Sequence, residues 1–222
     1  AVVEIALTAE EKSLAGALYT KRIVAQKGSC RSTYDDLRVS TSHCPFCLDG
    51  EIYEVDHFLP QAHHRDVVMY PSNLVPICHP CNHIKLQLLP MDARHSLLHP
   101  YFDRLPKQPW LFAEIDRMAD GPVLNFRVQL DETQHGNIAP RLHYHFATLR
   151  LDSRMRVRSA KVLIELQADV EQYLADLGAD GLKAHFASEA EKHFDRHGNT
   201  LETAAYRAAS TNDAFCAGEY KN

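Results

Sequence analysis

The chain has 222 residues, of which 45% are hydrophobic and 24% are charged, the proportions of a globular protein with one large or two small domains. Its formal net charge of -5 argues against a general polyanion-binding protein, so any contact with nucleic acid has to be local. No stretch approaches the ~20 apolar residues of a membrane span, and no charged-then-apolar leader opens the sequence. We therefore expect a cytoplasmic protein without a membrane partner.

The N-terminal stretch has the pattern of a helix. Thr8 followed three residues later by Glu11 has the form of a capping box, and Gly28 is a natural end for a helix. Apolar residues of this stretch fall near one helical face: Leu14, Leu18 and Ala25. The pattern predicts an N-terminal helical segment within residues 1–40.

Four cysteines form two Cys-x-x-Cys pairs that lie roughly thirty residues apart. Four thiolates at this spacing are the ligand set of a structural zinc site, which leaves no open position for chemistry. The alternatives are two pairs of ordinary buried cysteines, or disulfides, which a reducing cytosol disfavours. We expect Zn²⁺ to be bound by Cys44, Cys47, Cys78 and Cys81.

Polar residues lie between and just after the cysteine pairs. Asp56 and His57 fall in a short β-rich run, so we expect them to project from a strand or its end toward opposite sides. Asn82 directly follows the last cysteine, on the first turn of a helix that would start near Pro80. Lys85 lies about one turn further along a similar face. A strand and a helix that are both tied to the zinc could therefore face each other across a small gap.

This gap is a candidate site for a hard metal ion. The Asp56 carboxylate and the Asn82 amide oxygen would be two ligands, with water and a phosphate oxygen as the others. His57 would be free to act as general base on the attacking water, because imidazole titrates near neutral pH. A simpler interpretation is that Asp56 and His57 form an ion pair at the strand end and that the asparagines make turns.

The combined pattern resembles a known family. In chain order it reads Cys-x-x-Cys, Asp-His-x-x-Pro, Asn, and Cys-x-x-Cys-Asn-x-x-Lys. It is similar to the HNH endonucleases of the ββα-metal superfamily in their zinc-stapled form. The resemblance implies an α+β fold in which residues 41–105 form a ββα-metal nuclease module with a structural zinc. The N-terminal helix and a hairpin-plus-helical region over residues 106–222 would flank this module.

The resemblance also implies a role for each matching residue. His57 would be the general base, and Asp56 a ligand of the catalytic divalent ion, Mg²⁺ or another ion. Asn73 would brace the loop between the two strands. Asn82 would be the second ligand of the ion, at a position where many members have histidine.

Two further residues of the predicted helix bear on the same site. Lys85 matches a recurrent helix lysine of the family that could approach a phosphate. His83, one place after Asn82, is either an alternative ligand of the ion or a surface histidine.

The activity that the resemblance implies is metal-dependent hydrolysis of phosphodiester bonds, with double-stranded DNA as the expected substrate. The family further suggests restriction or anti-phage defence, in which such a protein can act beside an ATPase partner. Two alternatives stay open. One is an HNH nuclease directed at RNA, and the other is a zinc-dependent module that binds nucleic acid without cleaving it.

The second half of the chain predicts a hairpin followed by helices. Trp110–Met118 and Val123–Leu130 are rich in alternating apolar residues and are separated by a Gly-Pro turn signal. Leucines at helical spacing predict a helix from about Ser153 to Leu177. A Gly-Asn break then precedes a last helix over roughly Thr200 to Ala209.

The start of the predicted long helix contains the densest basic stretch of the chain. Its arginines could contact phosphates in a salt-sensitive and largely sequence-independent way. A solvated arginine face paired with nearby carboxylates is an equally good interpretation. The candidates for substrate contact are Arg154, Arg156 and Arg158.

Overall fold

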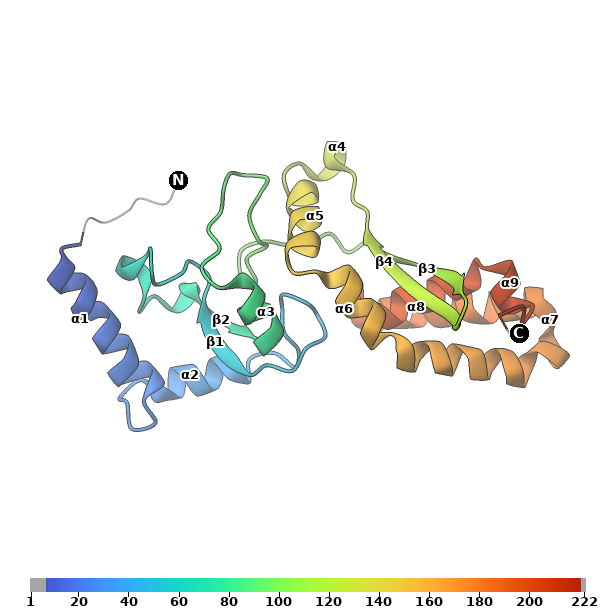
Figure 1. The fold of residues 1–222 in the computed structure, drawn as a ribbon, viewed down its shortest axis with the longest axis horizontal. Helices are drawn as coiled ribbons and strands as arrows, with labels where there is room; N and C mark the ends of the chain where they lie inside the picture. The colour runs from blue at the N-terminus through green and yellow to red at the C-terminus, as the bar shows by residue number, and fades with distance from the viewer. Residues whose placement is uncertain (1–6, 221–222) are drawn as a thin grey trace. The chain divides into compact units, whose positions relative to one another are not determined.

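In the computed structural model, which describes residues 7–220, the chain divides into two units, one ending at Arg104 and one beginning at Leu105 (Figure 1). Each unit combines helices with one two-stranded antiparallel sheet, so the fold is α+β, as predicted. Across residues 7–220, no helix has the length and apolar character needed to cross a membrane.

The first unit is built around a short hairpin. Strands β1 (Glu54–His57) and β2 (Leu74–Ile77) pair antiparallel along their whole length. Every residue of β2 is buried, whereas β1 alternates between half-buried and buried positions. Asp56 and His57 therefore face opposite sides of the strand, as predicted. Helix α3 (His79–Lys85) follows β2 almost directly and has a proline in its first turn, where a missing N–H costs nothing.

Helix α1 (Ala9–Tyr19) begins at the predicted capping box. The Thr8 hydroxyl accepts a hydrogen bond from the Glu11 N–H, and the Glu11 carboxylate accepts one from the Thr8 N–H. The helix continues into one π-helical turn, η1 (Thr20–Val24), and the helical stretch ends before the predicted stop at Gly28.

The helical face predicted from large apolar side chains is wrong. Leu14 and Leu18 are 61% and 38% exposed, whereas the buried positions are Gly16, Tyr19 and Ile23. These three recur at helical spacing, but the series starts at a glycine, which a search for bulky residues does not select. Tyr19 and Ile23 belong to a core cluster with three residues of the hairpin and its connecting loop: Val55, Val68 and Leu74.

Helix α2 (Arg31–Arg38), which was not predicted from the sequence, also packs against the hairpin. The connection between β1 and β2 contains two single 3₁₀ turns, η2 (Arg65–Val67) and η3 (Pro71–Asn73). The N-terminal helices and the cysteine-containing hairpin thus belong to one compact unit.

The second unit contains the predicted hairpin. Strands β3 (Leu111–Met118) and β4 (Gly121–Val128) pair antiparallel, and β4 buries alternating apolar side chains: Leu124, Phe126 and Val128. Helix α8 (Leu201–Ser210) packs along β3, and α6 (Leu151–Arg158) packs along β4. The helices of this unit are α4 (Glu132–His135), α5 (Ile138–Thr148), α6 (Leu151–Arg158), α7 (Ala160–His197), α8 (Leu201–Ser210) and α9 (Asp213–Cys216).

The predicted helix over Ser153–Leu177 is divided in the structure. Ser159 is a turn residue between α6 and α7 with φ of -71° and ψ of -7°, and the chain leaves helical geometry inside α7 at Gly178, where φ is 66° and ψ is 173°. The left-handed φ at this glycine ends the first straight part of α7 one residue after Leu177. Helix α8 begins at the predicted Thr200, whose side chain accepts a hydrogen bond from Thr203 N–H.

A single asparagine joins distant parts of the second unit. Asn199 Oδ1 accepts hydrogen bonds from the N–H groups of Trp110 (2.8 Å) and Leu111 (3.1 Å). Its Nδ2 donates to the Gln108 carbonyl (3.0 Å). The start of β3 is thereby fixed to the turn between α7 and α8.

Candidate functional site

The two Cys-x-x-Cys pairs come together, as predicted. Their four Sγ atoms lie within 4.8 Å of one another, and the four buried residues are Cys44, Cys47, Cys78 and Cys81. A cluster of four thiols at this separation fits a structural Zn²⁺. Hydrogen bonds from the three other thiols lower the pKa of Cys47, whereas the same hydrogen bonds raise the pKa values of Cys44 and Cys81, which act as donors within the cluster.

Backbone contacts hold the first cysteine pair in shape. The Gly50 N–H donates to Cys47 Sγ (3.3 Å), and the Cys44 N–H donates to the Gly50 carbonyl (2.7 Å). A side chain at Gly50 would crowd the cluster, because a Cβ there would lie 2.9 Å from Cys78 Sγ. The glycine therefore allows the backbone to pass directly over the sulfur atoms.

Asn73 makes the bracing contacts expected of it. It is 5% exposed, its Oδ1 accepts from the Leu59 N–H (2.7 Å), and its Nδ2 donates to the carbonyls of Leu59 (3.2 Å) and Val67 (3.3 Å). One side chain thus joins both ends of the loop that follows β1. The loop is held in place relative to the end of that strand.

His57 is buried, and one of its ring nitrogens is already engaged. Its Nε2 lies 2.9 Å from the Val68 carbonyl, and its ring meets the edge of the Tyr19 ring with centroids 4.5 Å apart. Because a carbonyl can only accept, Nε2 carries the proton and Nδ1 keeps its lone pair. The ring is therefore positioned as a base through Nδ1.

The surroundings keep His57 neutral. Burial lowers its pKa, and the positive charges of Lys85 and Arg65 lower it further. The hydrogen bond to Val68 and the charge of Asp56 act in the opposite direction and do not cancel the effect of burial. An imidazole in this environment is unprotonated at neutral pH and able to accept a proton.

Lys85 lies inside the site instead of at its surface. Its ammonium donates to Asp56 Oδ2 (2.7 Å) and to the His57 carbonyl (2.6 Å), and its side chain is only 1% exposed. In this arrangement Lys85 presents no ammonium to a phosphate at the surface, which departs from the sequence-based expectation. The contacts of Lys85 instead connect α3 to the end of β1 and hold the Asp56 carboxylate.

The oxygen donors predicted for a divalent ion lie on these same two elements. The Asp56 side chain is 21% exposed, and within residues 7–220 its Oδ1 has no hydrogen-bond partner. Asn82 is half-buried on α3, one turn before Lys85. His83 is exposed, and its ring stacks with that of His79 at 6.4 Å. A carboxylate and an amide oxygen are suitable donors for Mg²⁺, although they supply only one negative charge.

The three candidate arginines belong to α6, in the second unit. Arg154 Nη1 donates to the Leu149 carbonyl (3.1 Å), whereas Arg156 and Arg158 are exposed. His57 and Asp56 lie in the first unit. A contact between these arginines and a substrate therefore stays a prediction.

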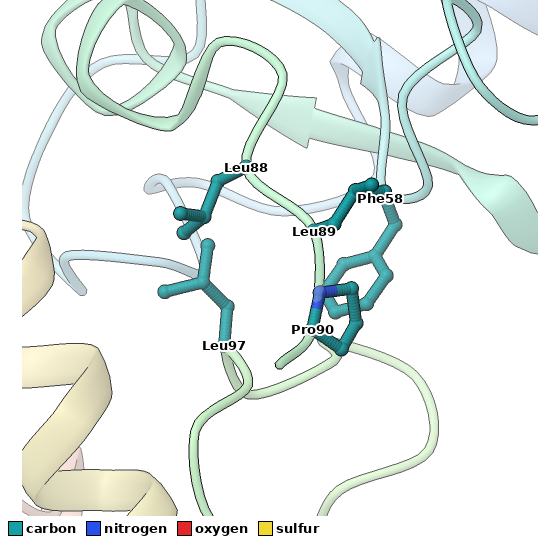
Figure 2. A pocket seen from close by; sticks show the side chains of 5 residues that line it. All are labelled: Phe58, Leu88, Leu89, Pro90 and Leu97. Carbon is teal, nitrogen blue, oxygen red and sulfur yellow. The ribbon is translucent and has the colours of Figure 1, made fainter. Parts of the chain in front are cut away.

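A small apolar pocket lies next to the site. Phe58, which follows His57, forms one wall, and the other lining residues are Leu88, Leu89, Pro90 and Leu97 (Figure 2). The Phe58 ring packs on the His99 ring with centroids 4.1 Å apart. Because its lining residues are all apolar, the pocket adds no reacting group to the site.

Two contacts of His57 were not predicted from the sequence. Tyr19 comes from α1 and Val68 from the β1–β2 loop, so both contacts depend on tertiary structure. A glycine three residues before Tyr19, inside a helical pattern, was the one local sign that this face packs closely against another part of the chain.

The comparisons with known proteins give one relative. The chain is similar to Protein ea31 of Escherichia phage lambda, with 33% identity over 154 residues. The match covers 67% of this chain and 52% of ea31, so the chain spans about half the length of that relative. The name of ea31 states no activity. No family model matches the chain, and no solved structure matches it.

Proposed function

We propose that the protein is an HNH-type endonuclease that hydrolyses phosphodiester bonds with the help of a divalent ion. The observation that carries this proposal is the state of His57. This histidine is buried and neutral, and its Nε2–H donates a hydrogen bond to the Val68 carbonyl. The preceding residue, Asp56, has a partly exposed carboxylate. A purely structural zinc module has no need for a base held in this way.

In the proposed reaction, His57 Nδ1 takes a proton from the attacking water, while the Val68 carbonyl keeps the ring in one orientation. Asp56 Oδ1 and the Asn82 amide oxygen would hold the ion. When bound, the ion stabilises the negative charge that develops on the phosphate and on the leaving 3′ oxygen. Lys85 holds the other oxygen of Asp56, so that the carboxylate offers the ion one defined oxygen.

The role proposed for zinc is structural. The cysteine pairs come before β1 and at the start of α3, the two elements that contain Asp56 and Lys85. Zn²⁺ bound by four thiolates has no free position for a substrate, so its contribution would be to hold these elements together.

Double-stranded DNA is the proposed substrate, in line with the resemblance to HNH endonucleases. A role in restriction or anti-phage defence and an ATPase partner rest on that resemblance alone. An RNA substrate is the second candidate, because a base and one ion can hydrolyse a phosphodiester bond in either nucleic acid.

The test is cleavage of supercoiled plasmid, and of a structured RNA in parallel, with and without added Mg²⁺. His57→Ala should abolish cleavage, and His63→Ala, which alters an exposed histidine of the following loop, should not. Asn82→Ala and His83→Ala separate the two candidate ligands of the ion. Zinc content is measured for every variant, so that loss of the base is distinguished from loss of the fold.

Cleavage that requires Mg²⁺ and is lost only in His57→Ala and in one of the two ligand variants supports the proposal. Cleavage of RNA but not DNA would show that the same reaction acts on RNA, the second candidate substrate. Nucleic-acid binding without cleavage of either substrate would refute the enzyme and favour the binding module.

A further inference from the structure

A phosphodiester that enters this site brings negative charge next to Asp56, so a cation has to contact it. Lys85 was the candidate from the sequence, but its ammonium is buried and already shared between Asp56 Oδ2 and the His57 carbonyl. Using it for the phosphate would leave the Asp56 carboxylate unpaired. A contact from the protein to the phosphate, in addition to that of the divalent ion, would therefore come from another cationic side chain close to His57.

Arg65 lies in the right place. It is the first residue of η2, and its carbonyl accepts a hydrogen bond from the N–H of Val68, the residue whose own carbonyl holds His57. The positive charge of Arg65 is close enough to His57 to act on the imidazole. One turn of the β1–β2 loop thus positions both this arginine and the proposed base.

The guanidinium is held against α1 at a glycine. A Cβ at the buried Gly16 would overlap Arg65 Nη1, so this group fills the space that a side chain at position 16 would take. Tyr19 is one turn further along the same helix, where its ring contacts His57. Helix α1 therefore contacts both Arg65 and His57, at two positions one turn apart.

The Arg65 guanidinium has no carboxylate or other hydrogen-bond partner within residues 7–220, and the residue is half-buried. Arg31 of the same unit differs, because it forms an ion pair with Asp35 at 2.8 Å. A guanidinium has five donors in a planar fork, which matches the oxygens of a phosphate. A guanidinium without an acceptor, close to a base that is ready to accept a proton, is arranged to bind an anion.

We propose that Arg65 contacts the phosphodiester that is cleaved, and that Gly16 is a glycine because α1 has to leave room for this guanidinium. This inference rests on the proposed nuclease function for the identity of the anion. It assigns the phosphate contact to Arg65 and leaves Lys85 to hold Asp56.

The test measures binding of a fluorescently labelled DNA duplex by anisotropy, without added divalent ions, so that no cleavage interferes. Arg65→Gln should weaken binding about tenfold or more, the effect of losing a charge-assisted contact, and should reduce the salt dependence by about one phosphate contact. Arg65→Lys keeps the charge but loses the fork, so its binding should lie between those of wild type and Arg65→Gln. Lys107→Gln removes one exposed charge elsewhere and is the matched control.

Gly16→Ala is the decisive variant, because it leaves Arg65 and its charge in the chain. Alanine favours a helix more than glycine does, yet its Cβ must displace the guanidinium. We expect weaker DNA binding than in wild type, with zinc content unchanged and α1 at least as well protected from hydrogen exchange. If Arg65→Gln does not fold, Gly16→Ala and Arg65→Lys decide the question.

Wild-type binding in a folded Arg65→Gln overturns the phosphate contact, even if the wild type cleaves DNA. Wild-type binding in Gly16→Ala overturns the role given to Gly16, because the guanidinium then reaches the phosphate from another position. Failure of the nuclease proposal gives a different result from failure of the Arg65 contact. A wild type that binds DNA but cleaves neither DNA nor RNA, with binding still reduced in Arg65→Gln, refutes the nuclease while the anion contact stands.

Discussion

Replacing Lys85 with methionine tests the arrangement of the site most directly. Methionine keeps most of the apolar stem of the side chain but removes the ammonium that lies 2.7 Å from Asp56 Oδ2 and 2.6 Å from the His57 carbonyl. Both partners then lose their donor, while the lysine position is too deeply buried for water to replace it fully. Lys85→Met should therefore destabilise the first unit.

The structure limits the size of this effect. Removing one partner of a fully buried ion pair costs about 3–5 kcal/mol, and leaving a buried carbonyl without its donor costs about 1–3 kcal/mol. The Asp56 side chain is 21% exposed, so water can recover part of the lost interaction. We expect a loss of about 2–4 kcal/mol in the free energy of unfolding of the first unit.

Hydrogen exchange followed by mass spectrometry is the suitable assay, because it reports each segment separately. The protection of amides in β1, β2 and α3 should fall by about 25- to 700-fold, the equivalent of that free energy. The single tryptophan of the chain, Trp110, is buried in the second unit, so its fluorescence is an internal control and should not change. Lys12→Met, at an exposed position of α1, is the matched variant.

Unchanged protection of β1 and α3 in Lys85→Met would refute the reasoning. The double variant with Asp56→Asn provides a second check. If the pair interacts as described, the double variant should lose less stability than the sum of the two single losses. Strict additivity would mean that the ammonium and the carboxylate do not depend on each other.

Three further outcomes follow from the site. Gly50→Ala should weaken the retention of Zn²⁺ against a competing chelator, because its Cβ would lie 2.9 Å from Cys78 Sγ. Retention equal to that of wild type would show that the backbone around residue 50 can move to accommodate the Cβ. Removal of Zn²⁺ should abolish hydrogen-exchange protection throughout the hairpin of the first unit, because all four cysteines lie in that unit. Trp110 fluorescence should stay unchanged, and loss of both signals together would contradict this expectation. Asn73→Ala removes three hydrogen bonds and should open the β1–β2 loop to limited proteolysis, with a cost of about 1–3 kcal/mol, whereas a loop as resistant as wild type would show that the brace is dispensable.

Features with a fixed local spacing could be predicted from the sequence. The two Cys-x-x-Cys pairs, the opposite orientation of Asp56 and His57 and the bracing by Asn73 agree with the structure. Each depends on turn geometry, on the two-residue period of a strand or on the order of a motif. The turn of each cysteine pair and the period of the strand are set within a few residues of the chain, whereas Asn73 reaches Leu59, 14 residues away, and its bracing was expected only from the resemblance to a family motif.

Features that depend on distant partners could not be predicted. Lys85 was correctly placed on a helix near the site, but nothing in its neighbourhood indicates that its ammonium meets Asp56, 29 residues away in sequence. Leu14 and Leu18 have the pattern of a buried face, yet the hairpin packs against Tyr19 and Ile23, and the Arg65 guanidinium of the β1–β2 loop lies against Gly16. Periodicity identifies a helix more reliably than it identifies the face that is covered.

The hydrogen bonds of Asn199 have a consequence for the order in which the two units fold during translation. The first unit forms its contacts within the residues up to Arg104, so it can fold and bring its four cysteines together while the rest of the chain is still on the ribosome. The N–H groups of Trp110 and Leu111 have to wait for Asn199, which is translated 89 and 88 residues later. During translation the first unit should therefore complete its fold before the second unit does. The start of β3 should lack its hydrogen-bond partner Asn199 until translation has passed α7.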